Sequence, residues 1–220
     1  MNNILKLFGA AVLCAASPAA TIAIFGTGVD NSNVVLSVGS IDTHYTLLSQ
    51  PGVTVTAGSN PVRYDHGAYT NVGFTNSGYV SPNAGGSAGT AGTLGIYVYQ
   101  TTFNIPVGFN PATATLAGKL STDNSGFVRL NNGANLATCS AGCFLAGQTF
   151  SVTGTGFVQG LNTFQIGVNN EGDPTALRLE FTTATVFPSE TSGVVPEPAS
   201  VGLLGLGLAG IGFLARRRIV

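Results

Sequence analysis

Apolar and polar residues alternate along the central part of the chain in short runs, and turn-forming residues separate these runs at intervals of about ten positions. Residues two apart in a strand point to the same side of a sheet, so such a run is typical of a strand with one buried face. No apolar stripe of helical spacing and useful length accompanies them. The pattern predicts an all-β domain built as a sandwich of two sheets.

Six of these runs are expected to supply the core, because their apolar side chains share one face. They are Thr101, Phe103 and Ile105; Ala114, Leu116 and Leu120; Val128 and Leu130; Phe150 and Val152; Phe164, Ile166 and Val168; and Leu177, Leu179 and Phe181. Arg178 and Glu180 alternate with the inward residues of the last run. We therefore expect both on the outer face, where a neighbouring ion pair contributes little to stability.

The charge of the chain is low and unevenly placed. Only 8% of the 220 residues are charged, against about 25% in an ordinary soluble domain, and 31 are glycines. Between residues 21 and 195, four basic residues stand against eight carboxylates, a net charge of −4. This balance disfavours nucleic-acid binding, which needs a basic surface to neutralise phosphates. The composition suits a secreted β protein.

Residues 1–23 have the three parts of a secretory signal peptide. Lys6 supplies a positive charge, residues 7–16 form an apolar run, and small residues follow. Cleavage after Ala19 and cleavage after Ala23 both satisfy the small-residue requirement, so the choice between them stays open. We expect the Sec machinery to export the protein through the inner membrane.

The C-terminus combines three features in order. They are the tripeptide Pro196, Glu197 and Pro198, an uncharged stretch at residues 199–215, and the basic end Arg216, Arg217 and Arg218. A helix of this stretch would be about 25 Å long, slightly short of a hydrocarbon core of about 30 Å. The arginines are expected to stay in the cytoplasm, which leaves the preceding domain outside the membrane. The prolines break the helix and hold the chain extended, as a processing enzyme requires.

These features resemble the sorting signal of the PEP-CTERM family of exported bacterial proteins. The resemblance covers the motif at residues 195–200, the glycine-rich apolar stretch and the terminal arginines. In that family the tail is recognised by exosortase, a membrane-embedded cysteine-type processing enzyme of Gram-negative bacteria that make exopolysaccharide. The resemblance implies an exosortase substrate that is transiently anchored, cleaved near the motif, and released or transferred to the cell surface or extracellular matrix.

A second resemblance concerns the domain between the signals, over residues 24–190. Residues 97–103, 114–118, 122–133 and 160–164 follow the order seen in galactose-binding-like jelly rolls, which are β-sandwich modules found beside glycosidase domains and in many PEP-CTERM ectodomains. An extra Asn132 precedes the glycine of one hairpin, so the register of that hairpin is expected to differ.

Glycan binding is the activity that this second resemblance suggests. A sugar ring would need an aromatic surface and a few polar groups. The sequence offers the tyrosines Tyr45, Tyr64, Tyr69, Tyr79, Tyr97 and Tyr99. Because Tyr97 and Tyr99 share one strand face, we favour packing roles for these two.

Cys139 and Cys143 are separated by three residues and would enter an oxidising compartment after export. We therefore expect a disulfide, which would close a five-residue loop and stabilise the fold by about 2 kcal/mol. A metal site is disfavoured, because His44 and His66 are far away in the sequence and no second cysteine pair exists.

No distinctive catalytic motif appears in the sequence. Ser87 has the Gly-x-Ser-x-Gly spacing at residues 85–89, but it lies in a glycine-rich stretch that we expect to be a loop, without the strand-to-helix turn of a nucleophile elbow. His44 is expected in a strand and His66 in a loop, neither with an identifiable catalytic partner. Asp123 and the pair Glu171 and Asp173 lie in turn-forming sequences, which we favour over Ca²⁺ sites. We therefore expect no enzyme activity, no metal and no cofactor.

The sequence thus predicts a signal peptide at residues 1–23, a β-sandwich at residues 24–190 and a sorting signal at residues 194–220. The expected function is non-catalytic, at the cell surface or in the exopolysaccharide of a biofilm, with polysaccharide as the candidate ligand. Two alternatives stay open. One is a secreted hydrolase whose site comes from unrecognised loop residues, and the other is a structural matrix protein that self-associates.

Overall fold

The computed structural model describes residues 18–189, apart from residues 53, 57, 70–72 and 87–93, together with Leu208. The chain divides into two compact units, residues 1–189 and residues 190–220. In the second unit Leu208 alone is described, in helical conformation, so the rest of the expected transmembrane helix lies outside the described residues. Residues 1–17 of the expected signal peptide also lie outside them. In the part of the chain that is described, no helix is long and apolar enough to cross a bilayer.

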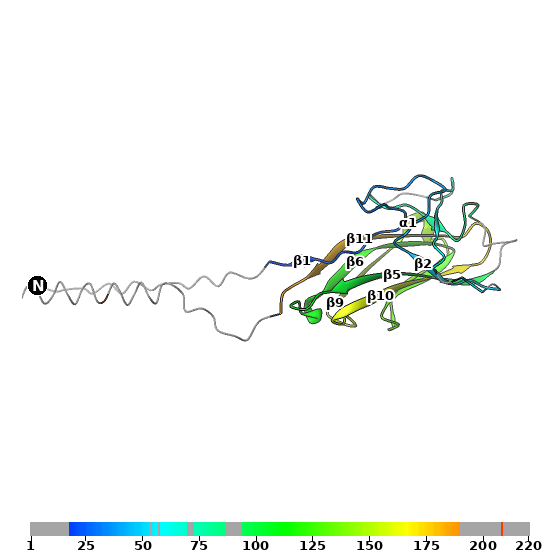
Figure 1. The fold of residues 1–220 in the computed structure, drawn as a ribbon. Helices are drawn as coiled ribbons and strands as arrows, with labels where there is room; N and C mark the ends of the chain where they lie inside the picture. The colour runs from blue at the N-terminus through cyan, green and yellow to red at the C-terminus, as the bar shows by residue number, and fades with distance from the viewer. Residues whose placement is uncertain are drawn as a thin grey trace, which may run out of the picture. The chain divides into compact units, whose positions relative to one another are not determined.

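The first unit consists of strands in two antiparallel sheets (Figure 1). The described strands are β1 (Ala20–Thr21), β2 (Thr46–Ser49), β3 (Val62–Arg63), β4 (Val80–Ser81), β5 (Gly95–Ile105), β6 (Thr115–Asp123), β7 (Ser125–Leu130), β8 (Asn135–Cys139), β9 (Gln148–Thr153), β10 (Gly160–Asn170) and β11 (Ala176–Val186). A 3-10 turn, η1 (Pro111–Thr113), and a single helical turn, α1 (Cys143–Ala146), lie in the connections.

Strands β4 to β11 have the connectivity of a jelly roll. The six-stranded sheet runs β3-β4-β11-β6-β9, with β1 paired to the other end of β11. The five-stranded sheet runs β2-β5-β10-β7-β8. Within them, the orders β4-β11-β6-β9 and β5-β10-β7-β8 are those of two Greek keys folded into a double-sheet jelly roll. The predicted all-β jelly-roll class is confirmed.

The core lies between the inward faces of the two sheets. The expected core residues are at most 8% exposed, apart from Phe181, which is half-buried. The pairing of β11 with β6 shifts between Phe181 and Thr183, and a bulge of this kind interrupts strict alternation. The Phe181 ring still packs against Phe150 and Phe164, with centroids 6.0 and 5.4 Å away.

The hairpin between β7 and β8 accommodates one additional residue. Asn131 and Asn132 both have left-handed backbone, with φ of 49° and 58°, a conformation that asparagine tolerates better than most residues. The pairing of the two strands shifts between Val128 and Arg129. The hairpin is therefore irregular on the strand side of this turn as well.

The two outer faces of the sandwich differ in what covers them. Loops of the N-terminal segment, residues 22–81, lie against β11, where residues 75–77 donate hydrogen bonds to Glu180. In Figure 1 the blue loops of this segment lie on the side of β11 and α1, whereas β2 lies beside β5 in the five-stranded sheet. Outward side chains of the five-stranded sheet, including Ile96 and Thr102, are exposed to solvent. We call this second surface the open face.

Residues 18–22 lie at the edge of the six-stranded sheet. Pro18 and Ala19 are exposed, whereas β1 pairs with the last two residues of β11. Ile22 follows, 3% exposed within the core, and its N–H donates to the carbonyl oxygen of Ala184 at 2.8 Å. The change from exposed to paired residues therefore falls directly after Ala19.

This boundary predicts which of the two candidate cleavage sites is used. Cleavage after Ala19 leaves β1 and Ile22 in the mature protein, whereas cleavage after Ala23 removes both. Losing one buried isoleucine costs about 2 kcal/mol of folding free energy. We expect N-terminal sequencing of the exported protein to begin at Ala20, and a sequence that begins at Ile24 would contradict the prediction.

Two substitutions provide a matched control for the cleavage site. Ala19→Leu places a large side chain at the proposed site, so the precursor should accumulate. Ala23 is exposed, so Ala23→Leu should leave both the fold and the cleavage after Ala19 unchanged.

Candidate functional site

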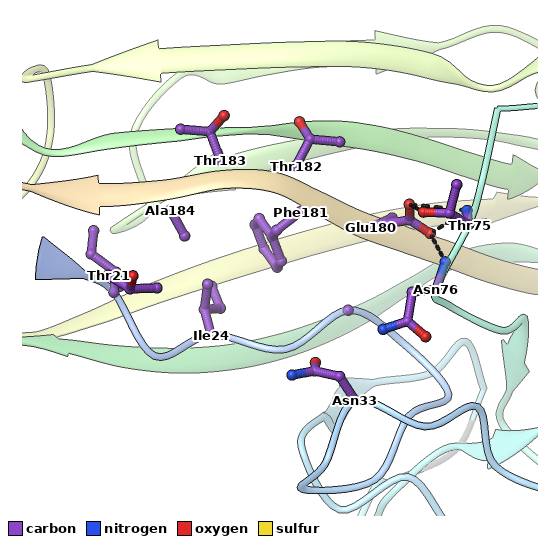
Figure 2. Close-up of a pocket in the computed structure, with 12 residues that line it drawn as sticks. Thr21, Ile24, Asn33, Thr75, Asn76, Glu180, Phe181, Thr182, Thr183 and Ala184 are labelled. Atoms are coloured by element: carbon purple, nitrogen blue, oxygen red, sulfur yellow. Dashed lines mark hydrogen bonds between the residues drawn. The ribbon is translucent and has the colours of Figure 1, made fainter.

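A cleft of about 510 Å³ runs along β11 on its covered side (Figure 2). The cleft is lined by residues 180–184 of β11 and by Thr21, Ile22, Ile24, Gly26, Asn33, Thr75 and Asn76. Backbone hydrogen bonds from Ile22 to Ala184 and from Thr27 to Leu179 bracket it. The cleft is therefore a gap in the pairing between the N-terminal segment and the edge of β11.

Glu180, at one end of this cleft, is held by a dense set of donors. The N–H of Thr75 donates to both carboxylate oxygens at 3.1 and 3.0 Å, and its Oγ1 donates to Oε1 at 2.7 Å. The N–H of Asn76 and the Oγ of Ser77 each donate to Oε2 at 2.8 Å. Burial by itself raises the pKa of Glu180, but these hydrogen bonds to the ionised form more than offset it, so the pKa lies below its ordinary value.

Arg178 is buried next to this carboxylate. Its Nε donates to Ser77 Oγ at 2.8 Å, and its guanidinium carbon lies 4.4 Å from the centroid of the Phe74 ring. Arg178 is 5% exposed and Glu180 is 7% exposed. The prediction that both lie on an exposed outer face was wrong, because contacts between residues 103 to 105 positions apart cover β11.

We predict that Glu180→Gln lowers the free energy of unfolding by about 2 kcal/mol at neutral pH, since an amide cannot accept from all of these donors. The pKa of Glu180 is lower in the folded state than in the unfolded state. Its contribution is therefore complete above about pH 4.5 and is lost as the pH falls through the folded value. Urea unfolding at pH 7 and pH 3 should show that the difference in the free energy of unfolding between wild type and Glu180→Gln is smaller at pH 3.

The matched control is Glu171→Gln, at an exposed carboxylate. It should change the free energy of unfolding by less than about 0.5 kcal/mol. The role given to Glu180 would be refuted if the free energies of unfolding of wild type and Glu180→Gln differed by the same amount at pH 7 and pH 3.

The six tyrosines do not form a stacking surface. Their exposed fractions are 8% or less for Tyr45, Tyr64, Tyr69, Tyr79, Tyr97 and Tyr99. Tyr97 and Tyr99 point into the core from β5, which confirms the packing role expected for them. The expectation that tyrosine rings offer an open face to a sugar is not met.

Several candidate residues meet near the connection between β6 and β7. The Tyr69 hydroxyl donates to Asp123 Oδ2 at 3.0 Å, and the rings of Tyr64 and His66 stack with centroids 6.4 Å apart. Burial raises the pKa of Asp123, and the hydrogen bond from Tyr69 offsets part of this rise. Asp123 thus joins the end of β6 to a loop, and His66 lies in that loop as expected.

His44 lies in the turn before β2, not in the strand where it was expected. Its Nδ1 is 3.1 Å from the Val29 carbonyl oxygen, its Nε2 is 2.9 Å from Asn31 Oδ1, and its ring stacks on Phe25 with centroids 3.9 Å apart. The neighbouring Asp42 is fully buried, which raises its pKa. Across the described ranges, no group of three His, Cys, Asp or Glu side chains could hold a metal ion.

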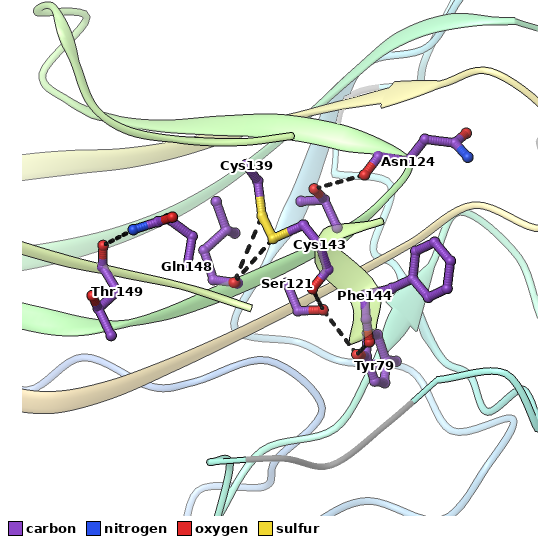
Figure 3. Close-up of a disulfide and its surroundings, with 10 residues drawn as sticks. Tyr79, Ser121, Asn124, Cys139, Cys143, Phe144, Gln148 and Thr149 are labelled. Atoms are coloured by element: carbon purple, nitrogen blue, oxygen red, sulfur yellow. Dashed lines mark hydrogen bonds between the residues drawn. A yellow bond between two sulfur atoms is a disulfide. The ribbon is translucent and has the colours of Figure 1, made fainter. Parts of the chain in front are cut away.

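Cys139 and Cys143 form a disulfide that connects β8 to α1 (Figure 3). Their Cα atoms are 5.6 Å apart. The hydroxyl of Ser121 on β6 donates to the Cys143 carbonyl oxygen at 3.3 Å and lies 2.8 Å from the Tyr79 hydroxyl. The disulfide therefore closes a short loop that rests on the six-stranded sheet.

The open face carries an ordered set of aromatic, amide and cationic groups. Phe127 on β7 lies across Gly167 on β10, where a Cβ would collide with the ring. The Nε of Arg129 donates to Gln165 Oε1 at 2.8 Å, and Gln165 Nε2 donates to Gln100 Oε1 at 2.9 Å. The Arg129 guanidinium carbon lies 5.5 Å from the centroid of the Phe127 ring.

Polar groups continue this arrangement beyond Phe127. The side-chain amide of Asn169 donates to Glu171 Oε1 at 2.9 Å, and the Ser125 hydroxyl donates to the same oxygen at 3.4 Å. Glu171 lies in the turn between β10 and β11, as expected, and its N–H donates to Asn124 Oδ1 at 2.7 Å. A carboxylate, an aromatic ring and a guanidinium thus follow one another along β7 and β10.

Sequence reasoning missed this set. In the sequence, Phe127 and Arg129 are outward residues of an ordinary strand, and Gly167 is a glycine that weakens the interior of another strand. Their contact depends on the register that places Phe127 opposite Gly167 and Arg129 opposite Gln165. A glycine and an aromatic residue, each at an outward position of a central strand, are the signal that could have found it.

Comparison with protein-family models finds the PEP-CTERM protein-sorting motif at residues 194–218. The matched range contains Pro196, Glu197, Pro198, Arg216, Arg217 and Arg218, which lie outside the described residues. The fold and the motif together define an exported β-sandwich protein with a C-terminal sorting signal. The chain carries the PEP-CTERM protein-sorting motif, which implies export, a C-terminal membrane anchor and processing by exosortase.

Two solved structures show limited likeness to this chain. One is the Stig cyclase FisC from Fischerella sp. TAU in complex with (3Z)-3-(1-methyl-2-pyrrolidinylidene)-3H-indole, with a TM-score of 0.43 and 18% identity over 79% of this chain and 100% of that chain. The other is the GH26-CBM35 β-(1,4)-mannanase of Podospora anserina, with a TM-score of 0.29 and 21% identity over 70% of this chain and 29% of that chain. No curated protein matches the chain. At these values neither likeness carries a functional inference.

Proposed function

We propose that this protein is a non-catalytic component of the cell surface or extracellular matrix that binds polysaccharide through its open face. The observation that carries the proposal is the sorting motif at residues 194–218, since it implies a protein that is exported and then processed at its C-terminus. The N-terminal signal engages the Sec machinery first. The arginines after the apolar stretch keep the C-terminus in the cytoplasm until exosortase acts.

The open face has the chemistry that a polysaccharide requires. A sugar ring presents apolar C–H groups and hydroxyls, so it is bound by an aromatic surface flanked by amides and charged groups. Phe127 supplies the ring, and Gln100, Arg129 and the buried Gln165 that connects them form the polar group beside it. The hydrogen bonds among the last three hold them in place before a ligand arrives, which lowers the entropy cost of binding.

The export part of the proposal is tested by the fate of the C-terminus. We predict that Glu197→Gln stays in the membrane at full length in the native host, whereas the wild-type protein loses its C-terminal segment. Intact mass measurement of the membrane and released fractions checks this, with a strain lacking exosortase as the reference. Glu190→Gln, outside the motif, is the matched control and should be processed normally. Released wild-type protein that keeps its terminal arginines would refute the proposal.

The binding part is tested with the full-length protein in detergent and the exopolysaccharide of its host. We predict that Phe127→Ala weakens binding at least fivefold in calorimetry, because the stacking surface is lost. Phe187→Ala is the matched control, since Phe187 is 45% exposed and lies outside the five-stranded sheet. Equal binding by both variants and wild type would exclude the open face. Shortening of the polysaccharide in the same mixtures would favour the hydrolase alternative.

A further inference from the structure

Arg129 is held in one orientation on the open face. Its Nε donates to Gln165, which is 6% exposed and is itself bonded to Gln100 on the neighbouring strand. This chain of hydrogen bonds crosses β7, β10 and β5, the central strands of the five-stranded sheet. The guanidinium plane is thereby fixed by its Nε edge, next to the Phe127 ring.

The other edge of the guanidinium is available to a ligand. Within the described residues, neither Nη1 nor Nη2 of Arg129 has a hydrogen-bond partner. Two parallel N–H groups on this edge match the two oxygens of a carboxylate, which lysine cannot imitate. Arg129 is also the one charged side chain among the described outward residues of the five-stranded sheet.

The other described cations of the domain are engaged elsewhere. Arg63 donates to the carbonyl oxygens of Tyr64 and Tyr79, and Arg178 is buried against Ser77. Lys119 lies on β6 of the six-stranded sheet, with its Nζ 5.0 Å from the centroid of the Phe74 ring. The domain carries net negative charge, so a single preorganised cation on its open face is a local exception that favours an anionic ligand.

We infer that the open face recognises an acidic polysaccharide, with Arg129 binding a sugar carboxylate through Nη1 and Nη2 beside the Phe127 ring. This inference rests on the proposed function and names the class of ligand. Gln165 is a positioning residue for Arg129, because it fixes the guanidinium through Nε. A neutral sugar would leave the Nη edge without a charged partner, so the uronic acid is preferred over its uncharged form.

The test compares one polymer in two charge states. Full-length protein in detergent is titrated by calorimetry with polygalacturonate and with its methyl ester, which keeps the sugar backbone and removes the charge. Wild type should bind the acid at least tenfold more tightly than the ester, the size expected for a hydrogen-bonded charge pair. Added salt should narrow the difference.

Variants assign that preference to the guanidinium. Arg129→Gln should bind the acid and the ester equally. Arg129→Lys keeps the charge and loses the planar guanidinium. Its preference for the acid over the ester should therefore be less than half that of wild type. Gln165→Leu should weaken binding of the acid. A double variant with Gln165→Leu and Arg129→Lys should bind the acid no more weakly than Gln165→Leu alone. Lys119→Gln removes the same charge from the other sheet and should bind as wild type does. Thermal melts confirm that each variant is folded.

The outcomes separate this inference from the proposed function. Equal binding of acid and ester by wild type overturns the inference and leaves polysaccharide binding intact. If neither polymer binds and the host exopolysaccharide does not bind either, the inference and the proposed function are both overturned. Tighter binding of dextran sulfate than of polygalacturonate overturns the assignment to a carboxylate. An unchanged preference in Arg129→Gln overturns the role of Arg129.

Discussion

The hydrogen bonds around Glu180 hold the N-terminal segment on one side of the sandwich, and the rest of the molecular surface depends on that attachment. Five donor contacts from residues 75–77 converge on one buried carboxylate. A carboxylate that satisfies its oxygens in this way tolerates burial, whereas an unpaired one would not. The same contacts bury Arg178 and convert the outer side of β11 from a surface into an interior.

This attachment leaves the two sheets with different tasks. The six-stranded sheet carries the N-terminal segment and β1 on β11 and supports the loop closed by the disulfide. Among the described residues, the five-stranded sheet has no such cover, and Phe127, Arg129 and Gln100 lie partly exposed around the buried Gln165 across three neighbouring strands. The domain therefore presents one structured polar surface, on the five-stranded sheet. That division supports a binding role more directly than the overall fold does, since one fold serves many functions.

Several expectations failed for a common reason. Glu180 and Arg178 alternate correctly with inward residues, yet the N-terminal segment covers them. Tyr45, Tyr64, Tyr69 and Tyr79 were candidates for contact with a sugar, yet each is at most 8% exposed. In each case a pattern within one strand predicts which way a side chain points, but it does not predict what another segment places on top of it.

The sequence by itself determined strands β5, β6, β7, β9, β10 and β11, most core residues and the sorting signal, because each depends on residues that are close together in the chain. Alternation at period two and the ordered motif at residues 194–218 are local patterns of this kind. The tertiary structure alone decided which outer face is covered and which side chains meet on the other. Those outcomes depend on strand register and on contacts between residues far apart in the sequence, and a one-residue change in register would turn every outward side chain inward.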